Sequence, residues 1–127
     1  MPRKLVRSLK YARAGAEHAL RTQRNIWIHI FIAIVVLALA FWLRVTLIEL
    51  VILVLTISFV ITTEIINTAI EELVNILSPE HRVEAALAKN VAAAAVLIAV
   101  IGSVILGLLI FAPKLMRVIG IAFFLPR

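Results

Sequence analysis

The stretch VTLIELVILVLTISFVITTEIINTAIEELVN, residues 45–75, decides the fold. Its first two-thirds are almost wholly apolar and long enough to cross a bilayer as a helix, whereas its last third carries carboxylates and amides. A charge at the bilayer centre costs roughly 2.5–3.5 kcal/mol by insertion scales, so these carboxylates indicate a site, a partner or the water boundary. At about 100° per residue they share one helix face, which can hold a divalent cation and orient a proton acceptor. The polar side chains on this face are Glu64, Asn67, Thr68, Glu71 and Asn75.

Composition points to an integral membrane protein. The chain has 127 residues, of which 64% are hydrophobic and 16% charged, and its mean hydropathy is +1.13. This apolar character disfavours a soluble domain and nucleic-acid binding. Since there is no cysteine, disulfides and thiolate metal sites are excluded. All seven acidic residues are glutamate, so a metal site must use Glu, His, Asn or Gln side chains, backbone or ligand phosphate oxygens.

Hydropathy and turn residues predict a single all-α membrane domain. An amphipathic helix over 3–22 should lie on the membrane surface, because its apolar residues recur at helical spacing between basic ones. Trp27 and Trp42 should anchor the two ends of the first span at the interfaces. Pro79 should end the long second helix and Pro113 the third span. The expected segments of the domain (1–127) are the surface helix 1–24, the spans 26–43, 45–63 and 91–111, and a tail 113–127 of unassigned role.

Charge predicts the orientation. Nine basic residues lie before the first span or between the second and third, and four lie on the opposite side. By the positive-inside rule, the N-terminus should be cytoplasmic and the C-terminus outside, in the inner (plasma) membrane. The basic N-terminal segment can also contact anionic headgroups or nucleotide phosphates, which is compatible with a role in topology.

Several segments carry a family resemblance. They are SLKYARAG (8–15), RTQRNIWIH (21–29), EIINTAIEELVN (64–75), SPEH (78–81) and AKNVAAAAVLIA (88–99). Together they resemble the small integral-membrane lipid kinases of bacteria, the diacylglycerol kinase and undecaprenol kinase family. The resemblance implies a homotrimer of three-span subunits with an N-terminal surface helix. It also implies transfer of the ATP γ-phosphate to a membrane lipid alcohol, with Mg²⁺, at the cytoplasmic interface.

The resemblance also implies roles for individual residues. Glu64 matches the general base and Asn67 its neighbour in the site. Glu71 matches the carboxylate that binds magnesium with ATP. Lys89 matches a lysine that contacts phosphate, and Tyr11 an aromatic residue near the nucleotide.

Three positions depart from the family pattern. Gln23, Asn75 and Asn90 each stand where the family usually has a carboxylate. Gln23 can still offer one oxygen to the metal, but no charge, and Asn90 accepts weaker hydrogen bonds than a carboxylate would. Gln23 and Asn90 are therefore expected to line the nucleotide and metal site or to be plain boundary residues. The loop residues that could close over the adenine are Glu80, His81 and Arg82.

Purely structural interpretations remain open for the same residues. Glu64 could make an interhelical hydrogen bond or relay protons, Glu71 could be a solvated charge, and Lys89 could extend to the interface. Glu72 is expected to be a solvated charge. His29, inside the first span, is expected to be a packed or interhelical histidine.

Two other functions compete with the kinase. The missing carboxylates would fit a catalytically silent relative that acts as a membrane scaffold or lipid binder. An intramembrane glutamate also occurs in small proton-coupled transporters, but those place it in mid-span. No Gly-x-x-x-x-Gly-Lys-[Ser/Thr] motif is present, so the chain is not a P-loop enzyme.

Overall fold

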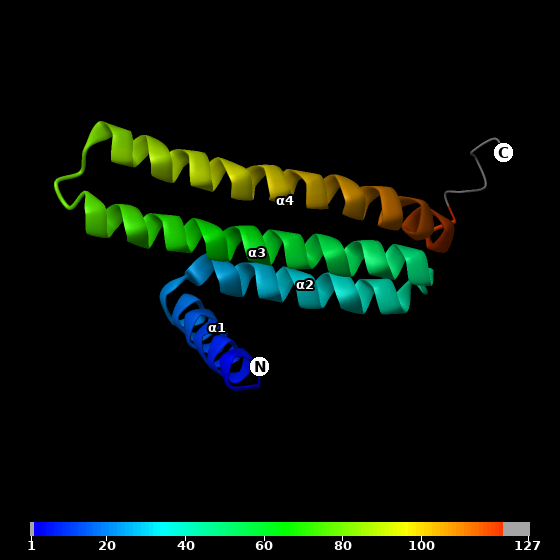
Figure 1. Cartoon of the computed structure of the whole chain (residues 1–127). Helices are drawn as coiled ribbons and strands as arrows, with labels where there is room; N and C mark the ends of the chain where they lie inside the picture. The colour runs from blue at the N-terminus through cyan, green and yellow to red at the C-terminus, as the bar shows by residue number, and fades with distance from the viewer. Residues whose placement is uncertain (1, 121–127) are drawn as a thin grey trace.

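The computed structural model describes residues 2–120, and this part of the chain forms four helices. They are α1 (Pro2–Thr22), α2 (Arg24–Trp42), α3 (Leu47–Leu77) and α4 (Val83–Val118). The helices α2, α3 and α4 run side by side with α3 in the middle, and α1 turns away from them at one end (Figure 1). All three are long and apolar enough to cross a membrane. The predicted all-α architecture with three spans and an N-terminal helix is confirmed.

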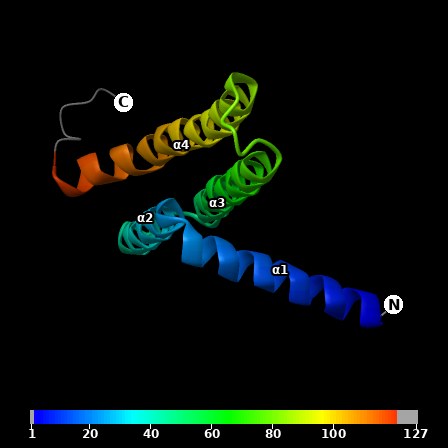
Figure 2. The same cartoon turned by 90° about the vertical axis from the view of Figure 1, so that its left-hand side faces the viewer.

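The break between α1 and α2 is a single residue. Gln23 has an extended backbone (φ −112°, ψ 110°), so α1 points away from the bundle (Figure 2). Ala19 and Ile26, on either side of the break, are both buried. The indole Nε1 of Trp27 donates a hydrogen bond of 2.7 Å to the carbonyl oxygen of Leu20. Because carbonyls in the last turn of a helix have no partner within it, this bond stabilises the end of α1.

A tight turn joins α2 to α3 at the opposite end of the bundle. Arg44 adopts a positive φ of 51°, and Thr46 then begins α3 with a capping box. The Thr46 backbone N–H donates to Glu49 Oε2 at 2.7 Å, and the Glu49 backbone N–H donates to Thr46 Oγ1 at 3.3 Å. These bonds satisfy backbone donors that a helix start otherwise leaves free, and they define where α3 begins.

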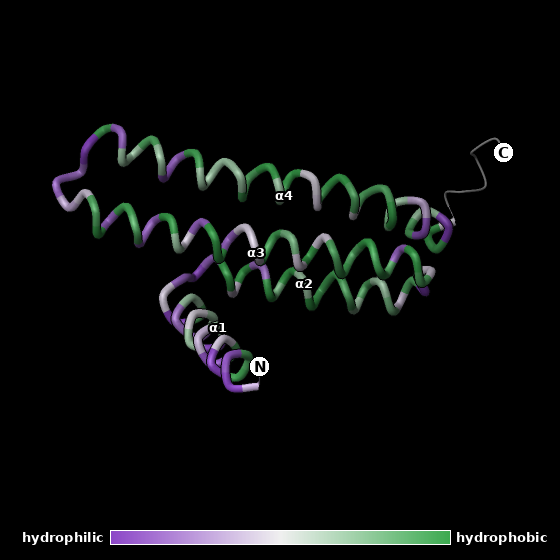
Figure 3. The backbone as a smooth tube through the Cα atoms, viewed as in Figure 1, coloured by the Kyte–Doolittle hydropathy of each residue, from purple (hydrophilic) through white to green (hydrophobic). Residues whose placement is uncertain are grey.

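The buried core lies at this same end. Ala40, Leu53, Ile110 and Phe111 form a cluster contributed by all three spanning helices. Outside this cluster, many large apolar side chains of α2, α3 and α4 are exposed. Hydrophobic residues cover the length of the bundle, whereas hydrophilic ones concentrate on α1 and at the α3–α4 turn (Figure 3). This distribution suits a chain whose outer surface is solvated by lipid.

The prediction that Pro113 ends the third helix is wrong. α4 continues through Pro113 to Val118. Proline removes one backbone donor and crowds the preceding turn, but nothing prevents the residues after it from staying helical. Spanning helices tolerate such a proline when neighbouring groups support the chain. Here Lys114 Nζ lies 3.0 Å from Glu49 Oε2 and joins the end of α4 to the start of α3. Residues 121–127 of the expected tail lie outside the described part.

Candidate active site

The polar stripe of α3 is buried in its middle. Glu64, Asn67 and Thr68 are the buried polar residues of the described chain, and Glu64 is only 2% exposed. The Thr68 hydroxyl donates to the backbone oxygen of Glu64 at 3.0 Å, and Asn67 Nδ2 donates to Glu71 Oε1 at 3.3 Å. Within the described residues 2–120, Asn67 Oδ1 is buried and has no hydrogen-bond partner. The stripe thus brings two carboxylates and a free amide oxygen onto one face, as the spacing predicts.

The carboxylate of Glu64 faces α2. His29 Nε2 lies 4.0 Å from Glu64 Oε2, with 17% of the histidine side chain and 3% of the glutamate side chain exposed. His29 is therefore an interhelical histidine, as expected. Its contact with the most buried carboxylate of the stripe was not foreseen, because sequence spacing does not show which helices face each other.

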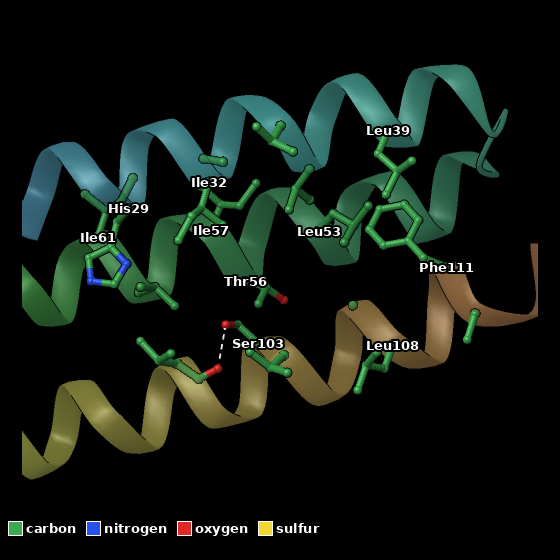
Figure 4. Close-up of a pocket in the computed structure, with 18 of the residues that line it drawn as sticks. His29, Ile32, Leu39, Leu53, Thr56, Ile57, Ile61, Ser103, Leu108 and Phe111 are labelled. Carbon is green, nitrogen blue, oxygen red and sulfur yellow. Dashed lines mark hydrogen bonds between the residues drawn. The ribbon is translucent and has the colours of Figure 1, made fainter. Parts of the chain in front are cut away.

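An apolar cavity of about 440 Å³ begins at this histidine and runs between α2, α3 and α4. His29, Thr56 and Ser103 are its polar lining residues (Figure 4). The hydroxyls of Thr56 and Ser103 each donate 2.7 Å bonds to backbone oxygens of their own helices. The cavity surface is therefore almost entirely hydrocarbon. Its lining includes residues 60 and 61 of α3, one turn before Glu64.

The loop between α3 and α4 is ordered by local bonds. Arg82 Nε lies 2.9 Å from Glu80 Oε1, and the Arg82 backbone N–H donates to Ser78 Oγ at 3.4 Å. His81 takes a left-handed backbone conformation (φ 57°) that reverses the chain. Lys89, half-buried, follows in the second turn of α4.

The structure does not bring the other predicted site residues together with the stripe. Tyr11 is 67% exposed on α1, and Gln23 is half-buried at the break between α1 and α2. Asn75 and Asn90 are exposed. Within residues 2–120, no hydrogen bond or ion pair links Tyr11, Gln23 or Lys89 to Glu64 or Glu71. The single chain thus assembles the α3 part of the predicted site and leaves the nucleotide part open.

The chain is similar to known proteins of one family. The family model described as prokaryotic diacylglycerol kinase matches residues 10–111. The chain belongs to the prokaryotic diacylglycerol kinase family. The match includes the whole polar stripe, the α3–α4 loop and the residues predicted for the nucleotide, from Tyr11 to Asn90.

Three curated members of this family are similar to the chain. An undecaprenol kinase of Bacillus subtilis is 38% identical over 109 residues, which cover 86% of this chain and 89% of that protein. A diacylglycerol kinase of Synechocystis is 38% identical over 113 residues, covering 88% of this chain and 65% of that protein. A diacylglycerol kinase of Haemophilus influenzae is 29% identical over 109 residues. The chain is thus a prokaryotic diacylglycerol kinase family member and a lipid kinase embedded in the membrane.

Sequence reasoning also missed a contact between α1 and α3 of this family member. Glu72 was expected to be a solvated charge, but its Oε1 lies 2.5 Å from Nε2 of His18 on α1. The pair joins the surface helix to α3 directly beside Glu71. No signal in the sequence indicates it, because the partners are 54 residues apart and both are half-exposed.

The oxygens of the stripe fit magnesium. Among the described residues, no group of three or more His, Cys, Asp or Glu side chains could enclose a metal alone. Magnesium needs no such cage, because it is commonly held by one or two carboxylates together with substrate phosphates. Glu71 supplies a carboxylate, and the free Asn67 Oδ1 beside it is a hard oxygen acceptor.

Proposed function

We propose that this lipid kinase transfers the γ-phosphate of ATP to the hydroxyl of undecaprenol or diacylglycerol at the cytoplasmic membrane surface, with Glu64 as general base. The observation that carries the proposal is the position of Glu64. Its carboxylate is buried on the stripe it shares with Asn67 and Glu71, one turn beyond an apolar cavity. A lipid alcohol entering from the bilayer would present its hydroxyl at this boundary.

Phosphoryl transfer depends mainly on how the phosphates and the attacking hydroxyl are positioned. Glu64 takes the proton of the lipid hydroxyl, whose oxygen forms the new bond to the γ-phosphorus. The bond between the γ-phosphorus and the bridging oxygen of ADP breaks, so ADP leaves with that electron pair. Burial of Glu64 keeps water from competing with the lipid as acceptor.

Glu71 and Gln23 are the proposed protein ligands of Mg²⁺, which when bound neutralises charge on the ATP phosphates. Glu71 contributes the charged oxygen. Asn67 holds the Glu71 carboxylate through its 3.3 Å hydrogen bond and so fixes the oxygen that remains for the metal. Gln23 brings an uncharged oxygen from the α1–α2 break, so charge neutralisation rests mainly on Glu71.

Residues outside the stripe are proposed to bind the nucleotide. Lys89 contacts phosphate and Tyr11 lies near the nucleotide, with Asn90 lining the site. The loop of Glu80, His81 and Arg82 closes over the adenine. These residues lie on α1, on α4 and on the loop before it, at the same end of the bundle (Figure 1).

The orientation and assembly are part of the proposal. The excess of basic residues at the α1 end supports a cytoplasmic N-terminus in the inner membrane. The proposed homotrimer is compatible with the small residues at the start of α4, which allow close helix packing. A neighbouring subunit would also complete the nucleotide part of the site.

The test is transfer of labelled phosphate from ATP with Mg²⁺ in mixed micelles. Undecaprenol and diacylglycerol are offered separately, and Glu64→Gln is assayed beside the wild type. Labelled lipid from the wild type and a loss of about 10³-fold or more in the variant are expected, since both the base and its charge are removed. An active Glu64→Gln would overturn the assignment of the base. A folded wild type that labels neither lipid would favour the catalytically silent relative, whose missing carboxylates at Gln23, Asn75 and Asn90 motivate that alternative.

A further inference from the structure

His29 is a half-buried titratable side chain that the proposed mechanism does not use. It lies where the apolar cavity meets the polar stripe, and its Nε2 is 4.0 Å from Glu64 Oε2. In residues 2–120, no other basic side chain comes within ion-pair distance of this carboxylate. A carboxylate with 3% of its side chain exposed loses most of its hydration and needs a polar partner.

We propose that His29 is a positioning residue that acts through Glu64. The imidazole fixes Oε2 and leaves Oε1 free to take the proton of the lipid hydroxyl. A separation of 4.0 Å is too long for a direct hydrogen bond, so a small ring rotation closes it when the acceptor binds. This inference rests on the proposed role of Glu64 as general base.

Two substitutions distinguish a positioning role of His29 from simple packing. Its neighbours in the cavity lining include Ile32, Ala33 and Ile61, all apolar. If the ring only filled space, leucine would replace it well and a polar amide poorly. If the ring positions Glu64, a glutamine that can donate to Oε2 should be the better substitute.

The test compares His29→Leu with His29→Gln in the full-length protein. For His29→Leu we expect kcat to fall about 10- to 100-fold, because a misplaced base is costly, while KM for ATP stays unchanged. His29→Gln should retain within about fivefold of wild-type kcat, since the polar contact is kept. The matched control is Phe31→Leu, an exposed side chain on the same helix that does not line the cavity, which should leave kcat unchanged. Thermal unfolding in detergent checks that each variant is folded.

A double-mutant cycle with Glu64→Asp shows whether His29 acts through Glu64. With the carboxylate already displaced, His29→Leu should reduce kcat by clearly less than it does in the wild type. Independent, multiplying effects would overturn the inference, as would a His29→Leu enzyme more active than His29→Gln. If Glu64→Gln inactivates the enzyme while His29→Leu does not, the inference fails and the proposed function stands. If Glu64→Gln stays active, the assignment of Glu64 as general base is wrong, and the inference about His29, which rests on it, fails as well.

Discussion

His18 on α1 and Glu72 on α3 are joined by a 2.5 Å contact between Nε2 and Oε1. The pair fastens the surface helix to α3 one residue after Glu71. Apart from this contact, α1 is held by the packing of Ala19 near the break and by the Trp27 bond to Leu20. The position of α1, and with it that of Tyr11, therefore depends on a few contacts near its C-terminal end.

Breaking the His18–Glu72 pair should loosen α1. For Glu72→Gln we expect faster hydrogen exchange in α1 and a KM for ATP raised a few-fold, while kcat changes little. The stabilisation of α1 that is lost with this pair should be only about 0.2–1 kcal/mol, because both side chains are half-exposed and screened by solvent. The control is the exchanged pair, His18→Glu with Glu72→His, which should restore the protection of the α1 amides from hydrogen exchange. Unchanged exchange in Glu72→Gln would show that α1 is held by other contacts.

Trp27→Phe should weaken the α1–α2 junction while keeping an aromatic side chain in it. The ring remains, but the 2.7 Å bond to the Leu20 oxygen is lost. We expect a destabilisation of about 0.5–1.5 kcal/mol at the end of α1, the usual net value of one hydrogen bond. Hydrogen exchange of residues 19–22 measures it, and Trp42→Phe at the other end of α2 should leave these amides unaffected.

The magnesium requirement should follow the number of carboxylates. We expect Glu71→Gln to raise the Mg²⁺ concentration at half-maximal activity about tenfold or more, because the one charged ligand is lost. Gln23→Glu should lower it several-fold by adding a second carboxylate. Titration of activity with Mg²⁺ at saturating ATP and lipid measures both. A Gln23→Glu enzyme with an unchanged Mg²⁺ requirement would place Gln23 outside the metal site.

The ion pair at the opposite end of the bundle should serve stability alone. Lys114 and Glu49 join α4 to α3 far from the stripe, and Glu49 also caps α3. We expect Lys114→Gln to lower the melting temperature in detergent and to leave kcat and both KM values unchanged. A change in kcat without a change in melting temperature would contradict this separation of stability from catalysis.

Some features of the site were accessible from sequence and others were not. The stripe of Glu64, Asn67 and Thr68 follows from helical periodicity, and the structure buries these three residues together. Asn75 shares that periodicity but is exposed, because α3 continues past the start of α2 and α2 does not reach its last turns (Figure 1). Periodicity defines a face, whereas burial depends on how far the neighbouring helix extends.

The sequence by itself determined the three spans, the N-terminal helix, the turn at Pro79 and the family. These depend on local quantities, namely the length of apolar runs, helical periodicity, turn residues and a specific short motif. The tertiary structure alone decided that His29 faces Glu64, that His18 meets Glu72, and that Lys114 pairs with Glu49. Each of these contacts joins residues on different helices, and their distances are set by helix packing, which no local pattern in the chain encodes.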